Sequence, residues 1–156
     1  MINLINISKH YGENQAVGSI DLTIESGKTT VLIGPSGCGK STILRAIIGL
    51  ISPDSGKVTI EGENLTPENL TSNRRKMGYV IQEGGLFPNL SARENVSLMA
   101  SYLGWDKERT EKRVEELCKL TKFPKDALNR YPIQISGGQR QRVAVARAIV
   151  NRGGSP

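Results

Sequence analysis

The residues with the clearest chemistry form one short glycine-rich loop. From residue 34 to residue 41 the chain reads G-P-S-G-C-G-K-S, which matches the pattern G-x-x-x-x-G-K-S. Glycines let the backbone turn its N–H groups around an anion, and a helix beginning at the end of the loop adds its positive N-terminus. The lysine reaches phosphate oxygens, and the last serine ligates the bridging Mg²⁺. The pattern predicts nucleotide binding by Gly34, Pro35, Ser36, Gly37, Cys38, Gly39, Lys40, Ser41 and Thr42.

The segments on both sides of this loop suit a phosphate-binding function. Residues 29–33 are β-branched and apolar, which predicts a buried strand, and residues 41–50 have the apolar spacing of a helix. A glycine-rich turn can match the pattern by chance. The strand before the loop and the helix after it favour the phosphate-binding interpretation.

A second glycine motif lies in the C-terminal half. Residues 135–139 read I-S-G-G-Q and precede the run R-Q-R-V-A-V-A-R-A. This sequence resembles the signature motif and following helix of the ATP-binding cassette (ABC) transporter ATPases, with Ile135 where the family usually has leucine. Residues 136–138 also place backbone N–H groups at a helix N-terminus, which favours anions. A simple helix N-cap is the plainer interpretation, and the same residues can serve both roles.

Three further segments match the ABC family in the same order along the chain. Tyr11 matches the aromatic residue that stacks on adenine, with Val17 close behind it. Gln82, after an expected strand over residues 77–81, matches the glutamine that approaches Mg²⁺ and the attacking water. Residues 86–91 resemble the segment that faces the membrane-spanning partner. On residue type alone, Tyr11 could cover a sheet and Gln82 could be an ordinary strand-end residue.

The resemblance implies a role for each motif. Lys40 and Gln82 would be catalytic, Ser41 and Gln82 would ligate Mg²⁺, and ATP would be the nucleotide. In the family, the signature residues contact the γ-phosphate bound by the opposite subunit, which implies a head-to-tail dimer of ATPase subunits. The other implied partners are transmembrane permease subunits and, indirectly, a solute-binding protein. The residues expected to make the contact across the dimer are Ser136, Gly137, Gly138 and Gln139.

One stretch of the sequence resembles a smaller group within the ABC family. Residues 74–82 and 85–88 are similar to the ATPases of importers for glycine betaine, choline and related osmoprotectants. The implied function is an ATP-binding subunit that couples ATP binding and hydrolysis to the import of a small solute. Two alternatives stay open. A soluble ABC ATPase acting on ribosomes or DNA would usually carry two cassettes or long inserted arms, and a non-catalytic fragment would bind nucleotide without turnover.

Some family motifs have no counterpart in this sequence. The family continues from the signature helix into a hydrophobic strand ending in Asp-Glu and later a switch histidine, whereas residues 150–156 read V-N-R-G-G-S-P. The single histidine, His10, lies near the expected adenine site. We therefore expect residues 1–152 to be a partial ABC ATPase domain without its general base and with little ATP turnover, and residues 153–156 to be a linker or tail. An unpaired apolar edge at residues 29–33 should promote association.

Composition limits the partners and the location. The 156 residues carry a formal charge of +6, as nucleic-acid-binding proteins often do. However, basic and acidic residues are interspersed, as in residues 108–113, and aromatic residues make up only 4 %, so a nucleic-acid partner is not expected. No apolar stretch reaches the roughly 20 residues that span a bilayer. Cys38 and Cys118 are poorly placed for a disulfide, so we expect a cytoplasmic protein held at the membrane by its permease.

Together these observations predict an α/β fold of the P-loop NTPase type. Short strands over residues 2–7, 20–24 and 58–60 would form a small antiparallel sheet that carries Tyr11. This sheet and the nucleotide-binding core would occupy residues 1–90. Residues 91–150 would form a helical subdomain, with helices over residues 91–102, 106–120 and 138–150.

Overall fold

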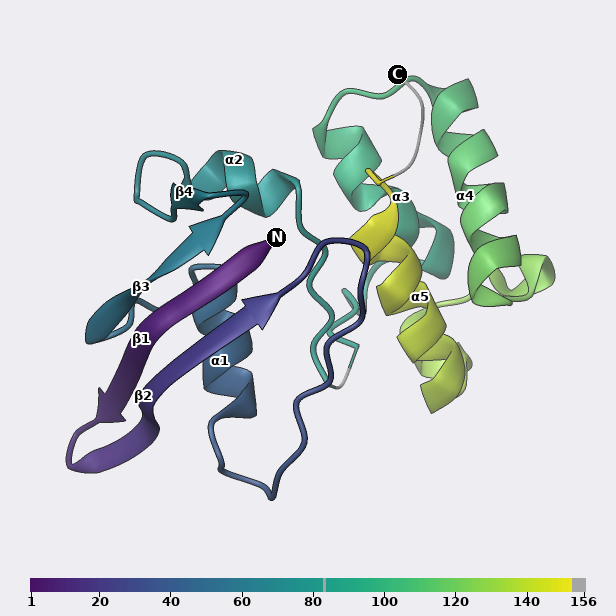
Figure 1. Cartoon of the computed structure of the whole chain (residues 1–156). Coiled ribbons are helices and arrows are strands. Elements are labelled where there is room, and N and C mark those ends of the chain that lie inside the picture. Colours follow the sequence, from purple (N-terminus) through teal and green to yellow (C-terminus); the bar gives the residue numbers. More distant parts are fainter. Residues whose placement is uncertain (83, 153–156) are drawn as a thin grey trace. The chain divides into compact units, whose positions relative to one another are not determined.

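The chain folds into two compact units, Met1–Arg75 and Lys76–Pro156 (Figure 1). The structure is a computed structural model that describes residues 1–82 and 84–152. The linker or tail expected at residues 153–156 lies outside the described residues. The first unit carries the glycine-rich loop, and the second carries Gln82 and the signature motif.

The first unit is built on an antiparallel sheet with the strand order β2-β1-β3-β4. β1 and β2 form a hairpin that pairs Ile2 with Ile24 and Tyr11 with Asn14. The three expected strands are confirmed, and each is longer than the apolar run that predicted it because polar residues join the ladder. The strands are β1 (Ile2–Tyr11), β2 (Asn14–Ile24), β3 (Ser55–Ile60) and β4 (Glu63–Asn64).

Two helices complete the first unit: α1 (Lys40–Ile47), which follows the glycine-rich loop, and α2 (Leu70–Arg75). Ile47 of α1 is buried in one apolar cluster with Leu4, Ile7, Val17 and Val58 of the sheet. Arg74 of α2 donates to the carbonyls that follow α1, at 3.0 Å to Ile48 and 2.6 Å to Gly49. These contacts fix the C-terminal end of α1, whose N-terminal end meets the loop.

The prediction of strands over residues 29–33 and 77–81 is wrong for this structure, because neither segment forms a strand. A strand needs a neighbour that supplies its hydrogen-bond ladder, and the ladder contacts of the described residues join β1 to β4 only. Apolar composition predicts burial but cannot supply that neighbour. Val31 is 70 % exposed and Ile33 is 91 % exposed. The association expected from this apolar segment stays a prediction.

The second unit is helical, as predicted. Its α-helices are α3 (Ala92–Tyr102), α4 (Lys107–Thr121) and α5 (Gly137–Ile149), with short 3-10 helices η1 (Lys125–Ala127) and η2 (Pro132–Gln134) between α4 and α5. The predicted capping box at the start of α3 is present: Ser91 N donates to Glu94 Oε2 at 2.7 Å, and Glu94 N donates to Ser91 Oγ at 3.3 Å. The core of the unit includes Val96, Ala100, Val114, Leu117, Phe123, Leu128, Val143, Ala146 and Val150.

Arg113 of α4 closes the C-terminal end of α5. Its side chain is buried and donates to the carbonyls of Ile149 and Val150, each at 3.0 Å. A third guanidinium nitrogen donates to Glu116 at 2.7 Å. Because the last carbonyls of a helix have no partner within it, a buried arginine is well suited to satisfy them.

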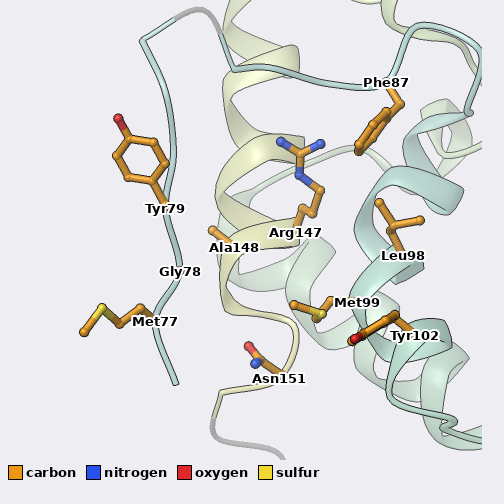
Figure 2. A pocket seen from close by; sticks show the side chains of 10 residues that line it. All are labelled: Met77, Gly78, Tyr79, Phe87, Leu98, Met99, Tyr102, Arg147, Ala148 and Asn151. Atoms are coloured by element: carbon orange, nitrogen blue, oxygen red, sulfur yellow. The ribbon is translucent and has the colours of Figure 1, made fainter. Parts of the chain in front are cut away.

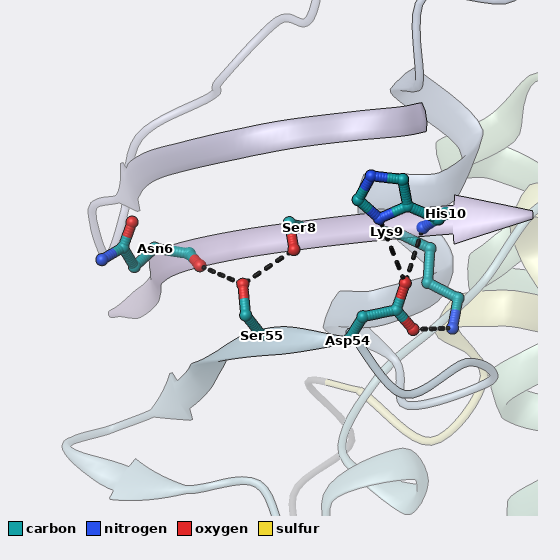
Figure 3. A network of polar contacts seen from close by, with 6 residues as sticks. All are labelled: Asn6, Ser8, Lys9, His10, Asp54 and Ser55. Atoms are coloured by element: carbon teal, nitrogen blue, oxygen red, sulfur yellow. Dashed lines mark hydrogen bonds and ion pairs between the residues drawn. The ribbon is translucent and has the colours of Figure 1, made fainter. Parts of the chain in front are cut away.

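A polar network holds the end of β1 against the turn that leads into β3 (Figure 3). Asp54 Oδ1 accepts from Lys9 Nζ at 2.6 Å, and Asp54 Oδ2 accepts from the backbone N–H of His10 at 2.6 Å. Ser55 Oγ lies 2.7 Å from Ser8 Oγ. The ladder between β1 and β3 is irregular here, so these side chains replace regular pairing. The network fixes the backbone immediately before Tyr11.

Asn95 of α3 anchors the segment before that helix. It is fully buried, and its Oδ1 accepts from Phe87 N at 2.9 Å. Its Nδ2 donates to the carbonyls of Phe87 at 3.1 Å and of Leu90 and Ser91 at 3.0 Å. One side chain therefore satisfies backbone groups along residues 87–91, a segment without regular ladder bonds.

The Asp54 network predicts a stability term that depends on pH. Hydrogen bonds from Lys9 and His10 hold the pKa of Asp54 below its ordinary value of 3.8. The folded protein therefore favours the carboxylate, so its contribution is present above about pH 4 and is lost as pH falls through the lower folded pKa. We expect Asp54→Asn to lower the thermal unfolding midpoint at about pH 7, and much less at about pH 3.

Scanning calorimetry at the two pH values would measure this difference. Asp126→Asn is the matched control, because it removes an exposed carboxylate whose ion pair is longer: Asp126 Oδ2 lies 3.6 Å from Arg130 Nη2. An Asp54→Asn effect of equal size at both pH values would contradict the role given to the carboxylate.

The Asn95 contacts predict a loss of global stability. Asn95→Ala would leave the partly buried N–H of Phe87 and three carbonyls without their side-chain partner, so we expect the free energy of unfolding to fall by about 1 to 3 kcal/mol. Urea unfolding would measure it. Asn129→Ala, at an exposed asparagine of the same unit, should stay within about 0.5 kcal/mol of the parent chain. If the two variants were equally stable, Asn95 would not anchor the segment.

Candidate nucleotide-binding site

The glycine-rich loop ends at the N-terminus of α1 with a backbone that only glycine adopts easily. Gly37 has a φ of 84° and Gly39 a φ of 91°, both in the left-handed region. Gly39 is the N-cap residue of α1, and no side chain caps the helix there. The first-turn N–H groups of α1 therefore form a donor set suited to an external anion.

Close packing against β2 leaves no room for a side chain at Gly39, and Cys38 would have to shift to admit one at Gly34. A Cβ at Gly39 would lie 2.4 Å from the Ala16 carbonyl oxygen and 3.1 Å from Val17 Cγ2, and one at Gly34 would lie 2.6 Å from Cys38 Sγ. β2 therefore supports the loop directly. Val17 is buried in the sheet core and lies against the loop, while its predicted contact with nucleotide stays a prediction.

Lys40 spans the loop from its end to its beginning. Its Nζ donates to the carbonyls of Gly34 at 2.8 Å and Pro35 at 2.7 Å, and lies 3.4 Å from Cys38 Sγ. The ammonium group is thus held at the loop by neutral acceptors, which are weaker partners than a charged phosphate. The donor set, the glycine backbone and the lysine fit a phosphate-binding loop. Of the other predicted residues, Ser36 and Ser41 are exposed, whereas Thr42 is buried.

Tyr11 belongs to the same unit as the loop. It is the last residue of β1, its side chain is exposed, and Lys9 Nζ lies 5.8 Å from the ring centroid. The Asp54 network fixes the two residues before it. An exposed aromatic ring at the end of an anchored strand is suited to stacking on a planar base.

The signature residues form the N-terminus of α5 in the second unit. Ser136 caps the helix: its Oγ accepts from Gln139 N at 3.2 Å, and its N–H donates to Gln139 Oε1 at 2.9 Å. The N-cap interpretation is therefore confirmed. Gly137 and Gly138 are exposed, and a Cβ at Gly138 would have no neighbouring heavy atom within 4 Å. This open backbone allows an anion to approach, while the γ-phosphate contact across a dimer stays a prediction.

Gln82 lies beside α5 in the second unit. Its side chain is exposed, and its carbonyl accepts from Gln141 Nε2 at 3.4 Å. The structure thus brings the loop, Val17 and Tyr11 together in one unit, and Gln82 and residues 136–139 together in the other. The roles of Gln82 as catalytic residue and Mg²⁺ ligand stay predictions.

The second unit also has a largely apolar groove of about 550 Å³ (Figure 2). Phe87 comes from the segment that was expected to face a membrane-spanning partner. Burial lowers the pKa of the Arg147 guanidinium, which lies beside that ring. The groove is lined by Met77, Gly78, Tyr79, Phe87, Leu98, Met99, Tyr102, Arg147, Ala148 and Asn151.

Sequence reasoning missed the residues that hold these segments in place. None of Asp54, Asn95 and Arg147 was singled out from the sequence. A signal for Asn95 exists, because it is a polar residue on the apolar side of α3, next to Val96 and one turn from Ala92. The contacts of Arg147 join distant parts of the chain and leave no local pattern.

Two structural features are absent from the described part of the chain. Residues 1–82 and 84–152 contain no group of three or more His, Cys, Asp or Glu side chains that could hold a metal ion. Within the same residues, every helix is too short or too polar to cross a bilayer.

Comparison with known proteins identifies the family. Residues 17–153 match the family described as ABC transporter. Over 150 residues the chain is 46 % identical to the glycine betaine/carnitine/choline transport ATP-binding protein OpuCA of Bacillus subtilis (strain 168), covering 96 % of this chain and 40 % of that protein. It is 43 % identical over 155 residues to the osmoprotectant import ATP-binding protein OsmV of Salmonella typhimurium, covering 96 % and 41 %. The chain spans about two fifths of the length of these curated relatives.

A solved structure gives the same answer for the fold. The structure described as a dimeric post-hydrolysis state of the ATP-binding cassette MJ0796 bound to ADP and Pi superposes with a TM-score of 0.88. The two sequences are 38 % identical, and the match covers 97 % of this chain and 70 % of that chain. The α/β fold class of the ABC ATPases is therefore confirmed. On the family match and this structural similarity, the chain belongs to the ABC transporter family.

Proposed function

We propose that this chain acts in the ATP-binding subunit of an ABC importer, which couples ATP binding and hydrolysis to the uptake of glycine betaine, choline or a related osmoprotectant. The observation that carries the proposal is the loop at residues 34–40, with its uncapped helix N-terminus and its lysine. The names of the OpuCA and OsmV relatives support the importer and its class of solute. They favour this function over a soluble ABC ATPase that acts on ribosomes or DNA.

Each residue predicted to act at the nucleotide has a defined part in this proposal. The loop amides and the first turn of α1 bind the phosphates, and Lys40 exchanges its carbonyl partners at Gly34 and Pro35 for phosphate oxygens. Tyr11 stacks on adenine. Ser41 and Gln82 would hold Mg²⁺ together with phosphate oxygens, and this ion supplies charge neutralisation at the phosphates when bound.

In this proposal the second unit contacts the partner proteins. Ser136, Gly137, Gly138 and Gln139 would bind the γ-phosphate held by a second ATPase subunit, in a head-to-tail dimer. The open backbone at Gly138 and the dimeric MJ0796 cassette support this arrangement. Phe87 and its groove would face the transmembrane permease subunits, on the cytoplasmic side of the membrane, and the solute-binding protein would act through them.

The first test concerns Lys40. Because Lys40→Ala removes a charged donor to phosphate, we expect the Kd for Mg-ATP to rise at least about tenfold, or about 1.4 kcal/mol, in titration calorimetry. Lys57→Ala, at an exposed lysine of the same unit, should leave the Kd unchanged. Equal affinities of the parent chain and Lys40→Ala would refute the site assignment. Phosphate release from the same samples would separate an active ATPase from a non-catalytic nucleotide-binding protein.

The second test concerns Tyr11. If the ring stacks on adenine, Tyr11→Ala should weaken ATP and ADP equally, by about 1 to 3 kcal/mol, whereas Tyr11→Phe should retain most of the affinity. Fluorescence competition with both nucleotides would measure the losses. Tyr131→Ala is the matched control, since Tyr11 and Tyr131 are both 46 % exposed. A loss confined to ATP would indicate a γ-phosphate role and contradict the stacking.

A further inference from the structure

α5 contacts the loop after Gln82 on successive helical turns. A Cβ at Gly84 would lie 3.6 Å from the Arg140 carbonyl oxygen and 3.7 Å from Ala144 Cβ, so this glycine packs directly on the helix. Arg147 Nη2 donates to the carbonyls of Gly85 at 2.8 Å and Gly84 at 3.3 Å. Positions 140, 144 and 147 are four and three residues apart, which places them on one face of α5.

Arg147 also connects this loop to its other neighbours. Its Nη1 donates to Asn95 Oδ1 at 3.4 Å, and its guanidinium lies 5.5 Å from the centroid of the Phe87 ring. Figure 2 shows the guanidinium directed toward that ring. The planar group has donors in a fixed fork, so one side chain can hold two carbonyls and an amide oxygen together.

The loop needs such a partner because of its backbone. Gly84 and Gly85 have φ values of 78° and 52°, and neither is in a helix or strand. Their carbonyls therefore depend on side chains or solvent. Gly84 is buried, so its carbonyl has limited access to solvent. Arg147 supplies a hydrogen-bond donor to this carbonyl.

We propose that Arg147 is a positioning residue that fastens the backbone following Gln82 to α5, so that Gln82 and the signature motif at the start of α5 move as one body. The meaning of this coupling rests on the proposed function, because it assigns Gln82 to the catalytic site. The fastening itself is a property of the second unit and can be measured without nucleotide.

Amide hydrogen exchange on the complete 156-residue chain tests the proposal. Arg147→Met keeps an unbranched stem but removes the donors, and we expect exchange at residues 84–87 to become roughly tenfold faster, while the buried amides of α3 and α4 change less than about twofold. Arg147→Lys keeps the charge without the fork and should give an intermediate rate. Arg142→Met is the matched control on α5, because Arg142 donates to Lys122 O at 2.6 Å.

Three results would overturn the proposal. They are unchanged exchange at residues 84–87 in a folded Arg147→Met variant, equal acceleration in Arg142→Met, and uniform acceleration across the unit with no rescue by lysine. If Arg147→Met does not fold, Arg147→Lys decides alone: local acceleration supports the proposal, and parent-like rates overturn it. Titration of the parent chain with Mg-ATP separates the fastening by Arg147 from the role of Gln82 in the proposed function. No binding there would refute the proposed function and the role of Gln82, whatever the exchange rates show.

Discussion

Several segments of this protein depend on one constraint: a backbone N–H or C=O group without a partner in a helix or ladder needs one from elsewhere. Side chains from neighbouring elements supply these partners. Asp54 holds the end of β1, Asn95 holds residues 87–91, and Arg147 holds the carbonyls of Gly84 and Gly85. Arg113 does the same for the last carbonyls of α5. Each of these segments is irregular or terminal, so a side chain sets its position. Asp54, Arg113 and Arg147 lie 36 or more residues away from the groups they hold, whereas Asn95 lies within eight residues.

This constraint explains which features could be predicted from sequence. The caps at Ser91 and Ser136 and the glycine-rich loop involve residues within a few positions of each other, so a local pattern specifies them. Helices α1, α3, α4 and α5 and strands β1, β2 and β3 were likewise predicted, from periodicity and β-branched runs, whereas α2 and β4 were not. The prediction of strands over residues 29–33 and 77–81 was wrong because a strand is defined by its hydrogen-bonded neighbour. The sequence of neither segment carries information about that neighbour. Arg147 was missed for the same reason, whereas Asn95 was missed although its place on the apolar side of α3 is a local signal.

The two glycine motifs use helix N-termini in different ways. At α1 the N-cap is Gly39, which leaves the first turn without a side-chain acceptor and adds the ammonium group of Lys40. At α5 the Ser136 hydroxyl already accepts from Gln139, so one first-turn donor is occupied while the hydroxyl keeps its own proton to donate. The first arrangement suits several phosphate oxygens at once. The second leaves fewer donors free and therefore suits a smaller anionic group.

The contacts of Lys40 have a consequence for selectivity. Since its ammonium already donates to the carbonyls of Gly34 and Pro35, an incoming anion replaces two acceptors and gains only the difference in interaction energy. A chloride ion or a single carboxylate brings one negative charge and few acceptor atoms, so it can engage only part of the donor set of the loop. A polyphosphate offers concentrated negative charge on several oxygens at once. The carbonyls of Gly34 and Pro35 therefore compete with any ligand for the Lys40 ammonium group. A ligand must present enough negative charge to displace them.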